Sequence, residues 1–173
     1  MINLLHFIKK TLILFLLLLS VSISTHAKVL FSDSKLGKVV LHEGEENKPL
    51  LMLNEKTILT GNDMFYRFYL EKVFDLSDSK ILIIGAHGDA QVCPTTFYII
   101  EISSYSKYKL TDNFGSCASA RKIWKRGETI FLEIPEYIQW PSALTSLQIR
   151  KLKRIVYFYS YKNSTLKVTK SNK

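Results

Sequence analysis

The sequence contains few of the residues that dominate fibrous or low-complexity proteins. Its 173 residues include only four prolines, seven glycines and two cysteines. This scarcity excludes a collagen-like or low-complexity chain. With 47% hydrophobic and 23% charged residues, the composition is instead that of an ordinary globular domain, and it also argues against a disordered chain.

Motifs of known catalytic or cofactor sites are also absent. The sequence has no Gly-x-Ser-x-Gly elbow, no phosphate-binding glycine loop and no His-Glu-x-x-His pair. Beyond residue 27 the only histidines are His42 and His87, which excludes a site built from three histidines. We therefore predict a non-enzymatic protein with no catalytic residue and no cofactor.

Two short segments hold the weak candidates for metal ligands. His87 and Asp89 are two residues apart in a glycine-containing segment that we expect to form a turn, where a carboxylate can orient an imidazole. The alternative is a hairpin tip whose polar residues face water. A second loop is acidic and either binds a divalent cation or is simply solvated. Its carboxylates are Glu43, Glu45 and Glu46.

The segment Met1 to Ala27 has the pattern of a secretory signal. Two lysines precede an apolar run, and Thr25-His26-Ala27 supplies a small-residue cleavage site. The apolar run from Thr11 to Ile23 is 13 residues long, whereas a membrane-spanning helix needs roughly 20, so an uncleaved anchor is the less favoured alternative. We expect residues 28–173 to form a single β-rich domain, periplasmic or secreted, without a transmembrane segment.

The two cysteines, Cys93 and Cys117, are expected to form one disulfide. They are 24 positions apart, and an exported chain meets an oxidising compartment. In the chain-entropy model, closing this loop stabilises the fold by about 3.5 kcal/mol. The alternatives are two buried thiols that do not meet and a redox-active pair, which the spacing does not favour.

Short apolar runs with a period of two residues predict strands joined by hairpins. From Met64 to Leu76, the side chains of Tyr66, Phe68 and Leu70 are expected on one face of a strand. Gly85 and Gly88 are expected to bracket the turn between the strands Lys80–Ile84 and Thr96–Ile102. The sequence therefore predicts an all-β fold, mainly an antiparallel meander that forms a twisted sheet or a small barrel.

The second half of the chain continues this pattern. Arg121–Trp124 is expected to pair with Thr129–Ile134, and Ile155–Tyr161 with Thr165–Thr169. Tyr157 and Tyr159 alternate with Val156 and Phe158, so the two tyrosines share a face. One short helix is predicted over Ser142–Leu152, with Ser142 as its N-cap. The sequence shows no internal repeat of fixed period.

Around the cysteines the sequence resembles a known group of proteins. Gly88, Cys93-Pro94 before an aromatic strand, and Phe114-Gly115-Ser116-Cys117 are similar to a pattern in small secreted proteins of Gram-negative bacteria that have no assigned function. The resemblance covers about 30 residues. It implies a periplasmic, β-rich, disulfide-bridged domain, and it transfers no catalytic residue.

The charge of the chain is concentrated at its C-terminal end. Residues 142–173 include eight basic and no acidic side chains. Such a block attracts an acidic protein or an anionic envelope surface, whereas nucleic acid is not expected for an exported protein. The alternative is a solvated tail that only aids solubility. The predicted partner-binding residues are Arg150, Lys151, Lys153, Arg154, Tyr157 and Tyr159.

These features predict a periplasmic binding module that acts through its surface, as an inhibitor or an immunity protein does. One alternative is an envelope-associated structural protein that binds anionic lipid. The other is a metal-dependent hydrolase built around His87 and Asp89.

Overall fold

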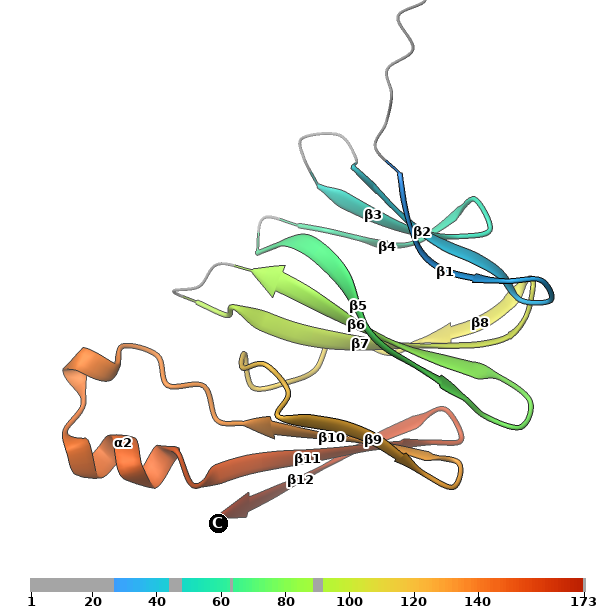
Figure 1. Ribbon diagram of the computed structural model, residues 1–173. Coiled ribbons are helices and arrows are strands. Elements are labelled where there is room, and N and C mark those ends of the chain that lie inside the picture. The colour runs from blue at the N-terminus through green and yellow to red at the C-terminus, as the bar shows by residue number, and fades with distance from the viewer. Residues whose placement is uncertain (1–26, 44–47, 63, 89–91, 173) are drawn as a thin grey trace, which may run out of the picture.

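The computed structural model describes residues 27–43, 48–62, 64–88 and 92–172 (Figure 1). Within these ranges, twelve strands form three antiparallel sheets of four strands each. Sheet 1 contains β1 (Lys28–Asp33), β2 (Gly37–Glu43), β3 (Pro49–Leu53) and β4 (Lys56–Thr60). Sheet 2 contains β5 (Phe65–Asp75), β6 (Lys80–Gly88), β7 (Thr95–Ser104) and β8 (Lys107–Leu110). Sheet 3 contains β9 (Lys122–Arg126), β10 (Thr129–Pro135), β11 (Ile155–Lys162) and β12 (Thr165–Asn172).

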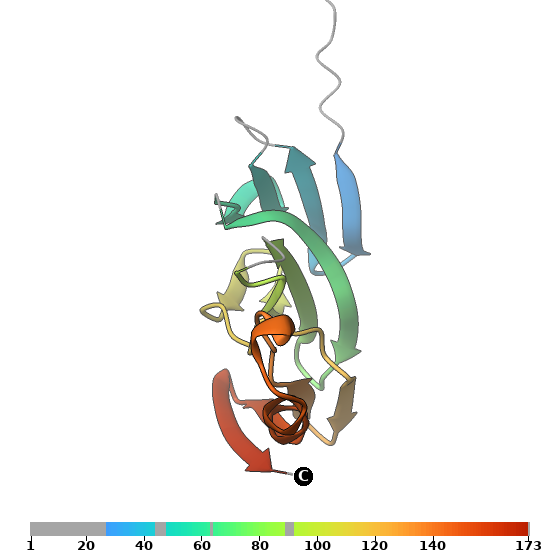
Figure 2. The same ribbon diagram turned by 90° about the vertical axis from the view of Figure 1, so that its left-hand side faces the viewer.

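The three sheets are stacked as layers, with sheet 2 in the middle (Figure 1). Each sheet is a simple meander, so strand order follows chain order in all three. In the view of Figure 2, β1, β5 and β9 lie at one edge of the stack, and β4, β8 and β12 lie at the opposite edge. The all-β antiparallel prediction is confirmed, but the chain builds three stacked sheets and neither a single twisted sheet nor a barrel. The four-stranded unit thus repeats in space, although no repeat is visible in the sequence.

Sheet 2 is covered on both faces, which explains its unbroken apolar strand. The side chains of residues 81–84 in β6 are all fully buried. Leu82 and Ile84 pack in the core shared with sheet 1, whereas Ile81 and Ile83 pack in the core shared with sheet 3. A strand buried on both faces loses the alternation of apolar and polar residues that marks a half-exposed strand.

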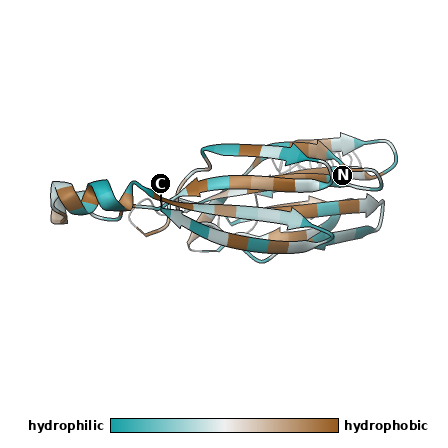
Figure 3. Cartoon of the chain, turned by 90° about the horizontal axis from the view of Figure 1, so that it is seen from below, coloured by the Kyte–Doolittle hydropathy of each residue, from teal (hydrophilic) through white to brown (hydrophobic). Residues whose placement is uncertain are grey.

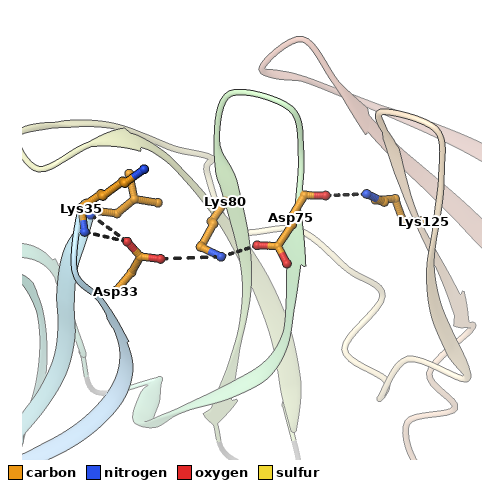
Figure 4. A network of polar contacts seen from close by, with 6 residues as sticks. Asp33, Lys35, Asp75, Lys80 and Lys125 are labelled. Carbon is orange, nitrogen blue, oxygen red and sulfur yellow. Dashed lines mark hydrogen bonds and ion pairs between the residues drawn. The ribbon is translucent and has the colours of Figure 1, made fainter.

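Equivalent hairpins of the three sheets lie side by side and are linked by polar contacts (Figure 4). The Lys80 ammonium group, at the start of β6, lies 3.7 Å from the Asp33 carboxylate of sheet 1 and pairs with the Asp75 carboxylate. Lys125 of sheet 3 donates to the Asp75 carbonyl oxygen. The Asp33 carboxylate also accepts the backbone N–H groups of Lys35 and Leu36, which lowers its pKa. These contacts link the equivalent hairpins of all three meanders at the same end of the stack.

Two details of sheet 2 differ from the sequence predictions. Tyr66 and Phe68 were expected on one face, but the register of β5 shifts between Phe65 and Arg67. As a result Phe68 is 2% exposed and Tyr66 is 57% exposed. β6 also runs through Gly85 to Gly88, so these glycines belong to the strand and do not bracket the turn. A Cβ atom at Gly85 would overlap the ring of Tyr69 on β5.

The helix is shorter than predicted and has another cap. A 3-10 turn, η2 (Pro141–Ala143), precedes α2 (Ser146–Leu152). Thr145 caps α2: its hydroxyl accepts the Gln148 backbone N–H, and the Gln148 side chain accepts the Thr145 N–H. This reciprocal capping box starts the helix at Ser146, so Ser142 is not the N-cap. The two predicted hairpins β9–β10 and β11–β12 are confirmed.

Candidate binding surface

A disulfide between Cys93 and Cys117 ties the link from β8 to β9 onto sheet 2. The two Cα atoms are 4.6 Å apart, which confirms the predicted pair. In the same link, Phe114 forms an isolated bridge with Phe97 of β7, and its carbonyl also accepts a 2.8 Å hydrogen bond from the Thr96 hydroxyl. The crossover between sheets 2 and 3 is therefore held covalently at one point and by backbone pairing at another.

A segment that we call the arm, residues 136–154, projects beyond the end of the sheets (Figures 1 and 3). It contains η2 and α2, and neither has a buried residue. Two large apolar side chains of the arm are open to solvent: Trp140 is 56% exposed and Leu147 is 60% exposed. An amphipathic helix normally covers its apolar face against a core. In α2 this cover is incomplete, because Ile149 and Leu152 are only partly buried and Leu147 is exposed.

The arm carries four cations and one carboxylate. Arg150 and Lys151 lie in the last turn of α2, where positive charge favours the helix dipole, and Lys153 and Arg154 follow directly. All four are exposed. Its carboxylate, Glu136, accepts a 2.7 Å hydrogen bond from the Tyr157 hydroxyl, which together with burial raises the pKa of Tyr157 to about 12. The arm therefore carries both exposed cations and exposed apolar side chains.

The structure separates the predicted partner-binding residues into two groups. The four cations Arg150, Lys151, Lys153 and Arg154 are gathered on or beside α2. Tyr157 and Tyr159 do share a face, as predicted, but that face of sheet 3 packs against sheet 2. Tyr159 is only 7% exposed, and its ring centre lies 5.0 Å from that of Phe114. Tyr159 is thus a core residue and not a surface contact, and Tyr157 is partly buried at the base of the arm.

Sequence reasoning missed Trp140 and Leu147 as surface residues. The relevant signal was present, because Pro135 and Pro141 flank Trp140 and end the strand before it. Trp140 itself has a φ angle of 53°, a left-handed conformation that residues other than glycine seldom adopt. The apolar spacing of α2 predicts a face that packs on the domain. Only the structure shows that Leu147 is open to solvent while Ile149 is partly buried.

His87 has a structural partner on its own hairpin. It lies in β6, its Nδ1 atom is 2.9 Å from the Pro94 carbonyl oxygen, and its ring centre is 5.0 Å from that of Tyr69. Since a carbonyl oxygen only accepts hydrogen bonds, Nδ1 carries the proton. Asp89, Glu45 and Glu46 lie outside the described residues, and Glu43 ends β2. Among the residues that are described, no three His, Cys, Asp or Glu side chains are grouped as a metal site.

Comparisons of the chain with protein-family models, with curated proteins and with solved structures found no match. Neither helical segment in the described ranges is long and apolar enough to cross a lipid bilayer. The predicted signal segment, apart from Ala27, lies outside those ranges. The arm, with its exposed cations and exposed apolar side chains, is the candidate binding surface.

Proposed function

We propose that this protein is a non-enzymatic binding module whose arm grips the acidic surface of a partner protein. The observation that carries the proposal is that one projecting segment holds the exposed side chains of Trp140 and Leu147 and four exposed cations, and that its helix has no buried residue. Trp and Arg are the residues that most often dominate the binding energy of protein interfaces. The stacked sheets serve as a rigid base from which the arm projects.

The chemistry of the arm defines the kind of partner. Its four cations steer an acidic surface toward the arm, so association is fastest at low salt. Trp140 and Leu147 then supply the apolar contact area that is lost from water on binding. A basic partner is excluded by charge repulsion. An inhibitor or an immunity protein that blocks an acidic enzyme or toxin has these properties.

The location that we propose is outside the cytosol, in the periplasm or secreted. The Cys93–Cys117 disulfide supports it, because such bonds persist in oxidising compartments. The signal-like pattern of Met1 to Ala27 supports the same location. A rigid bridged domain also survives in the envelope, where cytosolic chaperones do not act.

One observation favours a second candidate, the binding of anionic lipid. Tryptophan and leucine next to lysine and arginine are also the composition of helices that lie in a membrane interface. Trp140 and Leu147 are open to solvent, and Arg150 and Lys151 follow Leu147 by one turn of α2. In this alternative the arm inserts its apolar side chains among lipid headgroups, and no partner protein is needed.

The test compares two variants with equal charge change. In the arm variant, Arg150, Lys151, Lys153 and Arg154 are all replaced by Glu. In the control variant, four exposed cations outside the arm are replaced by Glu: Lys28, Lys35, Lys56 and Lys107. The immobilised protein captures partners from an envelope extract, and binding is then measured with the purified partner at low and high salt.

We expect the arm variant to lose binding while the control variant keeps it. A partner that binds both variants equally contradicts the proposal. Flotation with vesicles of anionic phospholipid separates the two candidates. Salt-sensitive flotation of the pure protein, with a blue shift of Trp140 fluorescence and no captured protein, supports lipid binding instead.

A further inference from the structure

The outer face of sheet 1, which points away from sheet 2, carries a stripe of aliphatic side chains. Val40 lies opposite Val29 on one side and Met52 on the other. Their chain neighbours Val39, Leu51 and Leu53 point the other way, into the core with sheet 2. Of these three side chains Val29 is 57% exposed and Met52 is partly buried, whereas Val40 between them is only 7% exposed. No element in the described ranges lies over this face (Figures 1 and 2).

The outer face of sheet 3 carries aromatic side chains. Phe131 lies opposite Trp124, and their rings are stacked with centres 5.3 Å apart. Both point away from the core, because Ile130 and Leu132 on the same strand are fully buried on the inner side. The Lys122 ammonium group lies 5.2 Å from the centre of the Trp124 ring. Beside Phe131 the face is hollowed by a depression of about 510 Å³ that also includes Ser160 and Lys167.

The two interfaces inside the chain show how such faces are covered. Each sheet of the stack packs an apolar face on the next sheet, and both interfaces combine aliphatic with aromatic side chains. In the second interface, for example, Ile81 and Ile83 pack in one core with Tyr159. All three meanders have the same orientation, so the next layer beyond sheet 3 would present a face equivalent to the outer face of sheet 1. A second copy of the chain supplies such a face.

We propose that two copies associate head to tail, so that the outer face of sheet 1 in each copy covers the outer face of sheet 3 in the other. The arrangement is a closed ring of six four-stranded meanders. Rings of such meanders, the β-propellers, typically have four to eight blades, all with their first strand at the inner edge. Here β1, β5 and β9 lie at one edge of the stack (Figure 2). One copy supplies three sheets, which is fewer than the number of blades in such a ring. Three copies would supply more sheets than the ring holds.

Charge counts against contact between two sheet 3 faces. The outer face of sheet 3 includes Lys122, Arg126 and Lys167, which lie opposite Glu133, Thr129 and Ser160 in the sheet. Two such faces brought together would oppose cations to cations. Two sheet 1 faces brought together would leave both aromatic faces uncovered. When two copies related by a two-fold axis pair unlike faces, all four of their outer faces are covered. No face is then left to bind a third copy.

The test measures the molar mass of the disulfide-bonded protein by light scattering after size-exclusion chromatography. We expect twice the mass of one chain. Val29→Lys changes one outer face and Trp124→Lys changes the other, and each is expected to halve the mass. The matched control is Val168→Lys, because Val168 is 58% exposed on β12 but lies opposite Tyr159, on the inner side of sheet 3. Circular dichroism confirms that each variant is folded.

Mixing the two variants adds a second readout. Each retains one intact face, so a mixture restores one of the two contacts and produces a mixed pair at raised concentration, whereas neither variant pairs alone. A wild-type protein that stays monomeric as its concentration rises overturns the proposal. A dimer that survives Trp124→Lys also overturns it, because contact between two sheet 1 faces then explains the dimer. A mass that grows without limit overturns the closed ring.

Discussion

The Tyr161 hydroxyl on β11 donates a 2.7 Å hydrogen bond to the Glu101 carboxylate on β7. This bond joins sheet 3 to sheet 2, and Tyr161 is only 2% exposed. The same carboxylate accepts hydrogen bonds from Ser164 at 2.7 Å and from Ser79 at 3.2 Å. Burial by itself would raise the pKa of Glu101, but these three hydrogen bonds and the nearby charge of Lys109 lower it overall. Burial and Glu101 in turn raise the pKa of Tyr161.

Tyr161→Phe should destabilise the protein by about 1.5–3 kcal/mol, the usual loss for a hydrogen bond to a charged group. The ring and its packing are kept, so the change isolates the hydroxyl. Urea unfolding gives the free energy. Tyr105→Phe serves as the control, because Tyr105 is 60% exposed and its substitution should change stability by less than about 0.5 kcal/mol. Equal stability of the two variants would show that the bond does not hold the sheets together.

Glu101 should also produce a pH dependence of stability. Its pKa is lower in the folded state than the ordinary value of 4.5, so its contribution is complete above that value and is lost as the pH falls through the folded-state pKa. Glu101→Gln should flatten this acid limb in urea titrations at several pH values. Glu55→Gln, at an exposed position of the β3–β4 turn, should keep the wild-type limb. An unchanged limb in Glu101→Gln would contradict the assigned electrostatics.

Removing the disulfide should cost about 3.5 kcal/mol for a loop of 24 residues in the chain-entropy model. The double variant Cys93→Ala and Cys117→Ala tests this by urea unfolding under non-reducing conditions. Reduction of the wild-type protein should lower its stability by a similar amount. Adding reductant to the double variant should have no effect, which controls for the reagent itself.

Gly85→Ala should destabilise the protein by about 1–3 kcal/mol, because the new methyl group overlaps the ring of Tyr69 on the paired strand. The substitution is repeated in a Tyr69→Leu background, where the ring is absent. There the cost should shrink, and the difference between the two backgrounds measures the coupling. Equal costs in both backgrounds would point to strand geometry and away from the ring as the cause.

Trp140→Ser with Leu147→Ser should leave the free energy of unfolding within about 0.5 kcal/mol of the wild type, because both side chains are exposed. The same variant should weaken partner binding. A loss of stability larger than this would mean that the two side chains cover the domain in solution and are not kept free for a partner. Thermal unfolding and binding are measured on the same preparation.

The sequence was sufficient to predict those elements that depend only on residues close together in the chain. The hairpins β9–β10 and β11–β12, the disulfide and the shared face of Tyr157 and Tyr159 were all predicted correctly. Alternation with a period of two and polar turn residues depend only on neighbouring positions, and so they can be recognised without a fold. The cap of α2 was misplaced because Ser142 and Thr145 both have a capping hydroxyl.

The stacking of the three sheets determines which sheet faces are buried, and the sequence pattern does not. Whether a face belongs to the core or to the surface depends on what lies over it. Tyr159 was predicted to bind a partner, yet sheet 2 covers it. Trp140 lies between two prolines in a segment with no periodicity, and it is exposed in the arm that projects beyond the sheets. The bulge in β5 reversed the face of Tyr66 for the same reason: a one-residue shift changes which side chains meet the neighbouring layer. The sequence thus determined strands, turns and charge, and the tertiary structure determined which of their faces a partner can reach.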